Sequence, residues 1–160
     1  MYAKSTRSIF FVCALFLCTG AIGSDCNISL PEKAHIPEAF PARQEYIWAG
    51  STEFAAYASI NGVWTGLGPN HNYRNKWWWW REDHKAGSDR GPELVITASR
   101  LDKPAPFVKN TQAKDGYAND WDSIIVLMEF PAPGCWEMTG SSHDHELKFI
   151  FKVGEDDSGT

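Results

Sequence analysis

The stretch HELKFIFKV, residues 145–153, decides the fold class of this chain. Large apolar residues occupy every second position, which is the period of a β-strand with one buried face. These residues are Leu147, Phe149, Phe151 and Val153. Lys148 and Lys152 fall on the opposite face. Residues 135–139 form a second apolar run across a predicted turn at 140–144, so the two runs predict an antiparallel hairpin.

Working outward from this hairpin, short apolar runs alternate with turn-forming residues along the chain. The runs that predict strands are residues 45–48, 54–60, 63–64, 76–81, 93–101 and 123–130. The uninterrupted apolar run at 123–130 predicts a strand covered on both faces. Asn61-Gly62 predicts a tight hairpin between its neighbouring strands, and we expect residues 115–122 to form a loop.

No window of the sequence keeps a helical period for three turns. The fold class is therefore predicted to be all-β, an antiparallel sandwich with a Greek-key or immunoglobulin-like arrangement, with a small barrel as the alternative. The length of 160 residues, with 43% hydrophobic and 22% charged residues, suits one globular domain and disfavours a coiled coil or a disordered chain. We expect an extended Pro-containing segment at 24–44, the sandwich at 45–154 and a flexible acidic tail at 155–160.

The first 23 residues have the pattern of a signal peptide. Lys4 and Arg7 precede the apolar run 9–17, and Ala21-Ile22-Gly23 places small residues at a cleavage site. The apolar run is shorter than the ~20 residues that span a bilayer. Leu17 before Cys18 and Asp25 before Cys26 do not fit a lipid-attachment site. We therefore expect an exported protein, periplasmic or extracellular, without a lipid anchor or a membrane span in the mature chain.

Cleavage would leave 13 basic and 20 acidic side chains, a net charge of −7. Since the chain has no run of Lys or Arg either, nucleic acid is disfavoured as a partner.

Cleavage would also leave two of the four cysteines, Cys26 and Cys135. In an oxidising compartment these two cysteines can form only one disulfide. It would close a loop of about a hundred residues and stabilise the fold by ~4–5 kcal/mol in the chain-entropy model. The alternatives are two free thiols or half of a metal site.

Chemical motifs give little support to catalysis. The sequence has no Gly-x-Ser-x-Gly elbow, no His-Glu-x-x-His and no Cys-x-x-Cys, so we predict a non-enzymatic protein without a cofactor. His143-Asp144-His145 puts two imidazoles on one side of an extended chain, as zinc or copper requires, but solvated turn residues are the expectation. Asn119-Asp120-Trp121-Asp122, after Asp115, offers oxygen atoms to calcium without the spacing of a calcium-binding loop.

The run Trp77-Trp78-Trp79-Trp80 is the strongest candidate for ligand binding, together with Arg81. Strand alternation sends Trp78 and Trp80 to one face and Trp77 and Trp79 to the other. An exposed pair would form a platform for a sugar ring, an aromatic ligand or a partner chain. The alternative is that the opposing sheet buries one pair and the Pro-rich segments bury the other.

Four stretches carry a resemblance to a family of small exported bacterial proteins of unknown function. They are Trp78-Trp79-Trp80-Arg81, residues 100–106 (RLDKPAP), Gly116-Tyr117 and residues 130–140 (FPAPGCWEMTG). Cys26 followed by Pro31 is similar to the opening of that family. The chain departs from the pattern at Trp77, which lengthens the aromatic run, and in the His-containing final turn. The resemblance implies an immunoglobulin-like sandwich with a bridge between Cys26 and Cys135, and it implies no activity.

Three functions follow as hypotheses. The first is an exported immunoglobulin-like module that binds a protein or a component of the cell envelope. The second is a module that binds carbohydrate or another small ligand through the Trp run. The third is a hydrolase or metalloprotein, which convergent His and carboxylate side chains would favour.

Overall fold

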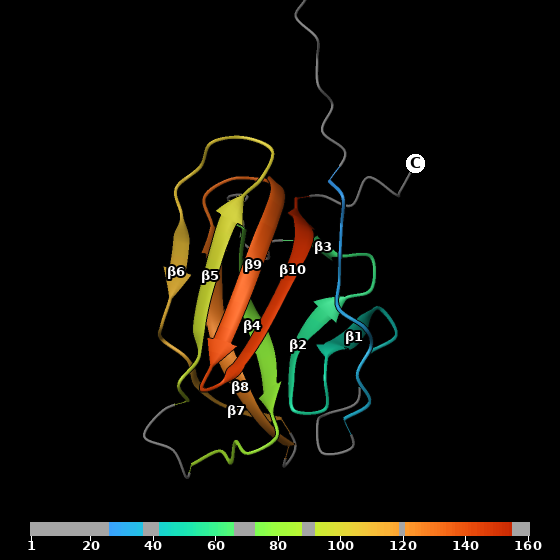
Figure 1. Ribbon diagram of the computed structural model, residues 1–160, viewed down its shortest axis with the longest axis vertical. Helices are drawn as coiled ribbons and strands as arrows, with labels where there is room; N and C mark the ends of the chain where they lie inside the picture. Colours follow the sequence, from blue (N-terminus) through green and yellow to red (C-terminus); the bar gives the residue numbers. More distant parts are fainter. Residues whose placement is uncertain (1–25, 37–41, 66–72, 88–91, 119–120, 155–160) are drawn as a thin grey trace, which may run out of the picture.

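A computed structural model describes residues 26–36, 42–65, 73–87, 92–118 and 121–154 (Figure 1). Every regular element in these ranges is a β-strand. The strands are β1 (Tyr46–Gly50), β2 (Phe54–Ser59), β3 (Val63–Trp64), β4 (Tyr73–Arg81), β5 (Val95–Arg100), β6 (Val108–Asn110), β7 (Lys114–Ala118), β8 (Trp121–Phe130), β9 (Gly134–Ser142) and β10 (His145–Val153). The described residues include no helix with the length and apolar character of a membrane span.

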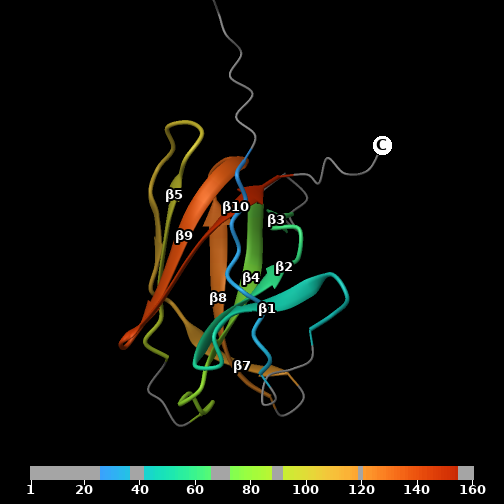
Figure 2. The same cartoon turned by 45° about the vertical axis from the view of Figure 1, so that its right-hand side comes forward.

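The strands form two five-stranded sheets that pack face to face. One sheet has the order β1-β2-β4-β8-β7 and the other the order β3-β10-β9-β5-β6. Figure 1 shows β5, β9 and β10 in front of β4 and β8. Figure 2 shows the same two layers after a turn of 45° about the vertical axis. The predicted all-β sandwich is thereby confirmed.

The core between the sheets is formed by the side chains that point inward at every second position of the strands. Leu94, Ile96 and Ala98 are buried, as the sequence pattern predicted. In the C-terminal hairpin, Phe149 is 3% exposed, and its strand pairs with β9 from His145↔Ser142 to Val153↔Gly134. This hairpin confirms the prediction from residues 145–153, although β9 extends further into the predicted turn.

The predicted hairpin at Asn61-Gly62 is wrong. β3 leaves β2 and pairs in parallel with β10, through Lys152↔Val63 and Val153↔Trp64. The physical reason is local: Gly62 has a φ of 65°, but Asn61 does not share the positive φ that a tight hairpin turn requires at both positions. Asn61 Oδ1 instead accepts the Val63 amide at 3.0 Å, and the chain crosses to the other sheet.

The predicted loop at 115–122 is also wrong. Residues 114–118 form edge strand β7, which pairs with β8 from Lys114↔Ile125 to Ala118↔Trp121. An edge strand needs backbone pairing rather than an apolar alternation, so its polar composition concealed it. Gly116 fits because a Cβ there would lie 2.5 Å from Cγ1 of Ile125.

The third correction concerns β8, which was predicted to be covered on both faces. Its inward side chains Ile124, Val126 and Met128 are fully buried. On its outward face, however, Leu127 is 40% exposed and Glu129 is exposed. The outer face of this sheet is therefore open along part of β8.

The described part of the N-terminal segment, residues 26–36, is extended and makes two isolated bridges, Ser29↔Ile150 and Lys33↔Ala49. Its first residue is joined to β9, since the Sγ atoms of Cys26 and Cys135 lie at the bonding distance of 2.08 Å. This is the disulfide expected from the cysteine count. The predicted signal peptide 1–23 and acidic tail 155–160 lie outside the described residues.

Candidate ligand-binding groove

The Trp run contributes to two separate clusters. Trp77 and Trp79 lie in the main core at 3% and 0% exposure. Trp80, at 2%, belongs to a second cluster on the outer side of the sheet, where its indole donates to the Thr52 carbonyl at 3.0 Å. Trp78 packs partly buried against the same cluster. Both faces of the run are therefore covered to a large extent, and Trp78 keeps the most accessible indole of the four.

Arg81 ends this strand with a buried guanidinium group, 2% exposed. It forms an ion pair with Asp83 and donates a hydrogen bond from Nη1 to Ser142 Oγ at 2.8 Å. Ser142 Oγ donates in turn to the Glu93 carbonyl at 2.7 Å. The hydrogen bond that Arg81 donates to Asp83, together with the charge of the guanidinium group, holds the pKa of Asp83 below its usual value. The arginine thus links the two sheets at one end of the sandwich.

The open outer face of β4, β8 and β7 contains a groove of about 350 Å³. Its lining residues are Lys76, Asn110, Gln112, Lys114, Asp115, Ile125 and Leu127. Strand register explains this composition, because Lys76 pairs with Leu127 and Lys114 pairs with Ile125 across neighbouring strands. Paired residues share a face of the sheet, so two lysines flank an apolar floor.

One wall of the groove is the connection from β6 to β7, where the chain passes from one sheet to the other. Asn110 fixes this connection: its side-chain amide donates to the Leu127 carbonyl at 2.6 Å, and its Oδ1 accepts the Gln112 amide at 2.7 Å. Both ends of the Asn110 side chain are therefore used within the protein. The side chain of Gln112 is exposed beside it.

The electrostatic character of the groove comes from its lysines. Among the described residues, neither Lys76 nor Lys114 forms an ion pair. The single acid among the lining residues is Asp115, whose Oδ2 accepts the Gly87 amide at 2.8 Å, while its buried Oδ1 lies 3.5 Å from His84 Nε2 without a hydrogen bond from the described residues. Two ammonium groups beside apolar side chains make a site that favours an anionic ligand with an apolar face.

A His, an Asp and a Ser converge next to the groove, but not as a catalytic triad. His84 Nε2 lies 3.2 Å from the backbone carbonyl of Ser123 rather than from its hydroxyl. The Ser123 hydroxyl is buried and donates to the Gly116 carbonyl at 2.8 Å. In a nucleophilic triad the hydroxyl bonds to the imidazole and reaches substrate. This arrangement instead fastens β7 and β8 to the turn after β4.

The two histidines of the His143-Asp144-His145 candidate face different partners, and His145 Nε2 lies 3.5 Å from Asp144 Oδ1. His143, with a φ of 52°, lies 3.5 Å from Glu93 Oε2 and 3.8 Å from Asp83 Oδ2. His145 instead stacks on Phe54 with ring centroids 5.9 Å apart. Among the residues that the structure describes, no group of three or more His, Cys, Asp or Glu side chains is arranged to hold a metal ion.

The calcium candidates act as acceptors for the backbone. Asp122 Oδ1 accepts the Ala86 amide at 3.0 Å, as Asp115 does for Gly87. Both carboxylates therefore hold the turn that follows β4. Asn119 and Asp120 lie outside the described residues.

Sequence reasoning missed the lining of the groove, and the signal for it was weak. Lys76 and Lys114 are 38 positions apart in the chain, and each by itself reads as an ordinary surface lysine. They come together because β7 is a strand, which its polar sequence concealed.

Comparison with known proteins adds no relative at this point: no protein-family model, no curated protein and no solved structure matches the chain.

Proposed function

We propose that this protein is an exported, non-enzymatic binding module, and that its ligand is an acidic saccharide of the cell envelope or its surroundings. The observation that carries the proposal is the groove on the outer face of β4, β8 and β7, where Lys76 and Lys114 flank Ile125 and Leu127. The carboxylates of an acidic sugar would pair with the ammonium groups, while the C–H faces of its rings would lie on the apolar floor.

The position of the groove favours a saccharide over a peptide strand. The backbone groups of β4 and β8 are used in the sheet ladder, from Tyr73↔Phe130 to Trp79↔Ile124. A ligand on the floor of the groove therefore meets side chains, whereas the unpaired backbone groups that an extended peptide seeks lie at its rim, on the outer edge of β7. Trp78 pairs with Ile125 on the same face, and so its partly exposed indole offers a further surface for ring stacking.

Export is part of the proposal and rests on the N-terminal sequence, with support from the Cys26–Cys135 disulfide. We infer a protein that stays in the periplasm or leaves the cell without a lipid anchor. We also infer the immunoglobulin-like arrangement, which the strand order supports. A constant-type immunoglobulin domain has seven strands, A to G, with A, B, E and D in one sheet and C, F and G in the other. Lettered A to G in chain order, β2, β4, β5, β7, β8, β9 and β10 have the same neighbours in each sheet.

The test is calorimetric titration with oligogalacturonate, an acidic saccharide, against an uncharged glucan of equal length. We expect binding of the acidic oligomer that weakens as salt rises, because the contacts are ionic. The double variant Lys76→Gln/Lys114→Gln should weaken binding at least tenfold, since each charge-assisted hydrogen bond contributes about 1.5–3 kcal/mol. The variant Lys103→Gln/Lys148→Gln changes the net charge equally outside the groove and is the matched control.

Equal losses in the two double variants would reduce the interaction to general charge and overturn the assignment of the groove. Absence of binding to the acidic oligomer would overturn the saccharide proposal. Tight binding of an envelope protein that Lys76→Gln/Lys114→Gln leaves unchanged would favour the first sequence hypothesis instead.

A further inference from the structure

The N-terminal segment 26–36, which we call the strap, bonds to the edges of both sheets. At β10 the backbones of Ser29 and Ile150 exchange two hydrogen bonds, of 3.0 and 2.9 Å. At β1 the Ala34 amide donates to the Trp48 carbonyl at 2.8 Å, and the Gly50 amide donates to the Glu32 carbonyl at 2.9 Å. Figures 1 and 2 show the blue strap passing beside β10 and on to β1. The strap therefore covers one open side of the sandwich.

Side chains of the strap complete both apolar clusters. Leu30 packs against the main core between the sheets. Ile36, 7% exposed, is a member of the outer cluster with Trp48 and Trp80. Withdrawal of the strap would therefore open one edge of each sheet and uncover two indoles on the outer face that also holds the groove.

Contact with the turn after β2 shows how closely the strap lies on the sandwich. A Cβ at Gly62 would lie 2.3 Å from Cγ2 of Ile28, so this position accommodates the strap because it has no side chain. The Ile28 contact, the four hydrogen bonds and the packing of Leu30 and Ile36 must offset the loss of backbone freedom over eleven residues. Segments with few buried apolar contacts can open locally while the rest of a domain stays folded.

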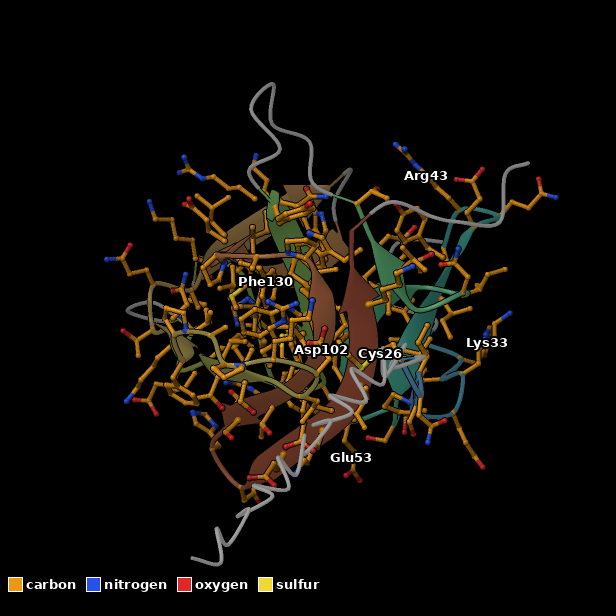
Figure 3. The ribbon with its side chains drawn as sticks, turned by 90° about the horizontal axis from the view of Figure 1, so that it is seen from above. Cys26, Lys33, Arg43, Glu53, Asp102 and Phe130 are labelled. Atoms are coloured by element: carbon orange, nitrogen blue, oxygen red, sulfur yellow. A yellow bond between two sulfur atoms is a disulfide. The ribbon has the colours of Figure 1, made fainter. Side chains whose placement is uncertain are left out.

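The Cys26–Cys135 disulfide fixes the start of the strap to β9. Asp102 holds the β9 side, since its Oδ1 accepts the Cys135 amide at 3.2 Å and it pairs with Arg100 Nε at 2.7 Å. Figure 3 shows Cys26 and Asp102 near one another at this end of the sandwich. Cys135 is 7% exposed, whereas Cys26 is only partly buried, so Cys26 is the more accessible residue of the pair.

We propose that this disulfide is a redox latch: its reduction releases the strap from β1 and β10 while the two sheets stay folded. A dithiol supplies the electrons. One of its thiolates attacks Cys26 Sγ and expels the Cys135 thiolate, and its second thiolate then resolves the mixed disulfide. The dithiol becomes a disulfide, and Cys26 and Cys135 end as two thiols after taking up two electrons and two protons. The reduced protein presents the edges of β1 and β10 and the Trp48–Trp80 cluster.

Hydrogen exchange measured by mass spectrometry, with and without dithiothreitol, tests the latch. We expect reduction to speed exchange at least a hundredfold at the four strap-linked amides, those of Ser29, Ala34, Gly50 and Ile150, with no change across the β4–β8 ladder. The double variant Cys26→Ser/Cys135→Ser should behave as the reduced protein does, without reductant. Protected strap amides after reduction would overturn the proposal, and so would equal loss of protection across β4 and β8, which would mean that the whole domain unfolds.

Ile36→Ser serves as a second variant that leaves the disulfide intact. It should speed exchange at Ala34 and Gly50 while Ser29 and Ile150 stay protected, because the latch still holds the first half of the strap. Equal acceleration at all four amides would contradict the role of the disulfide. Acrylamide quenching of tryptophan fluorescence should rise in the reduced protein, and Trp80→Phe should diminish that rise.

Discussion

Gly140 of β9 lies directly against the indole of Trp79 of β4, across the interface between the two sheets. A Cβ at position 140 would come within 2.3 Å of Cη2 of that ring. Trp79 is fully buried, with Phe54 stacked on it at a centroid distance of 5.4 Å. The indole therefore fills the space that a side chain at 140 would take, and the spacing of the sheets here depends on a glycine.

Gly140→Ala should consequently destabilise the domain by about 1–3 kcal/mol, the usual cost of overpacking a core. Urea denaturation measures the free energy of unfolding. Ser141→Ala, at the next position on the opposite face, should change it by less than about 0.5 kcal/mol and is the control. A neutral effect of Gly140→Ala would show that the sheets separate easily at this point.

Truncation within the Trp run should have unequal effects. Trp79→Ala removes a fully buried indole and should cost about 3–5 kcal/mol, because the cavity cannot collapse between packed sheets. Trp78→Ala removes a partly exposed indole from the outer face and should cost clearly less. Thermal denaturation of the two variants compares them. Equal losses would mean that the outer face is packed as firmly as the core.

Phe149 tests the facing of the C-terminal hairpin. The ring is 3% exposed and lies 5.7 Å, centroid to centroid, from Trp77. Phe149→Ala should cost about 3–5 kcal/mol. Lys148, on the opposite face, is exposed and pairs with Glu137 at 2.9 Å, so Lys148→Ala should cost less than about 1 kcal/mol. A larger loss for Lys148→Ala than for Phe149→Ala would mean that the inward face of β10 had been assigned to the wrong side.

Asp102 makes the stability of the domain depend on pH in the acidic range. The hydrogen bonds from Arg100 hold the pKa of this carboxyl below its ordinary value of 3.8. A carboxyl whose pKa is lower in the folded state stabilises that state fully above the unfolded-state value, and the contribution disappears as pH falls from about 4 through the folded-state value. Asp102→Asn should therefore lower stability at pH 7 by about 1–3 kcal/mol and flatten its decline below pH 4.

Chemical denaturation at pH 7, 5, 4 and 3 measures this difference. Asp144→Asn is the matched control, because it makes the same substitution at a side chain that is 91% exposed. Parallel pH profiles for Asp102→Asn and the unsubstituted protein would show that Asp102 does not contribute to the acid sensitivity.

The sequence by itself determined those features that depend on local period and on counting. Alternation at Leu147, Phe149, Phe151 and Val153 settled the β10 facing, because side chains of a strand alternate whatever the strand pairs with. Two cysteines in the expected mature chain left one possible disulfide. The run at 77–80 had to divide its indoles between two faces, as it does between the main core and the outer cluster.

Tertiary structure alone decided which strands pair, and the groove depends on that pairing. β3 joins β10 and not β2, and residues 114–118 form an edge strand, because backbone hydrogen bonds to distant segments determine both and carry no local signature. The same pairing brings Lys114 to the side of Ile125, across from Lys76 and Leu127. Tertiary structure also places Ile36 of the strap against Trp48 and Trp80. The burial of these two indoles depends on a distant segment, so no pattern in their own strands predicts it.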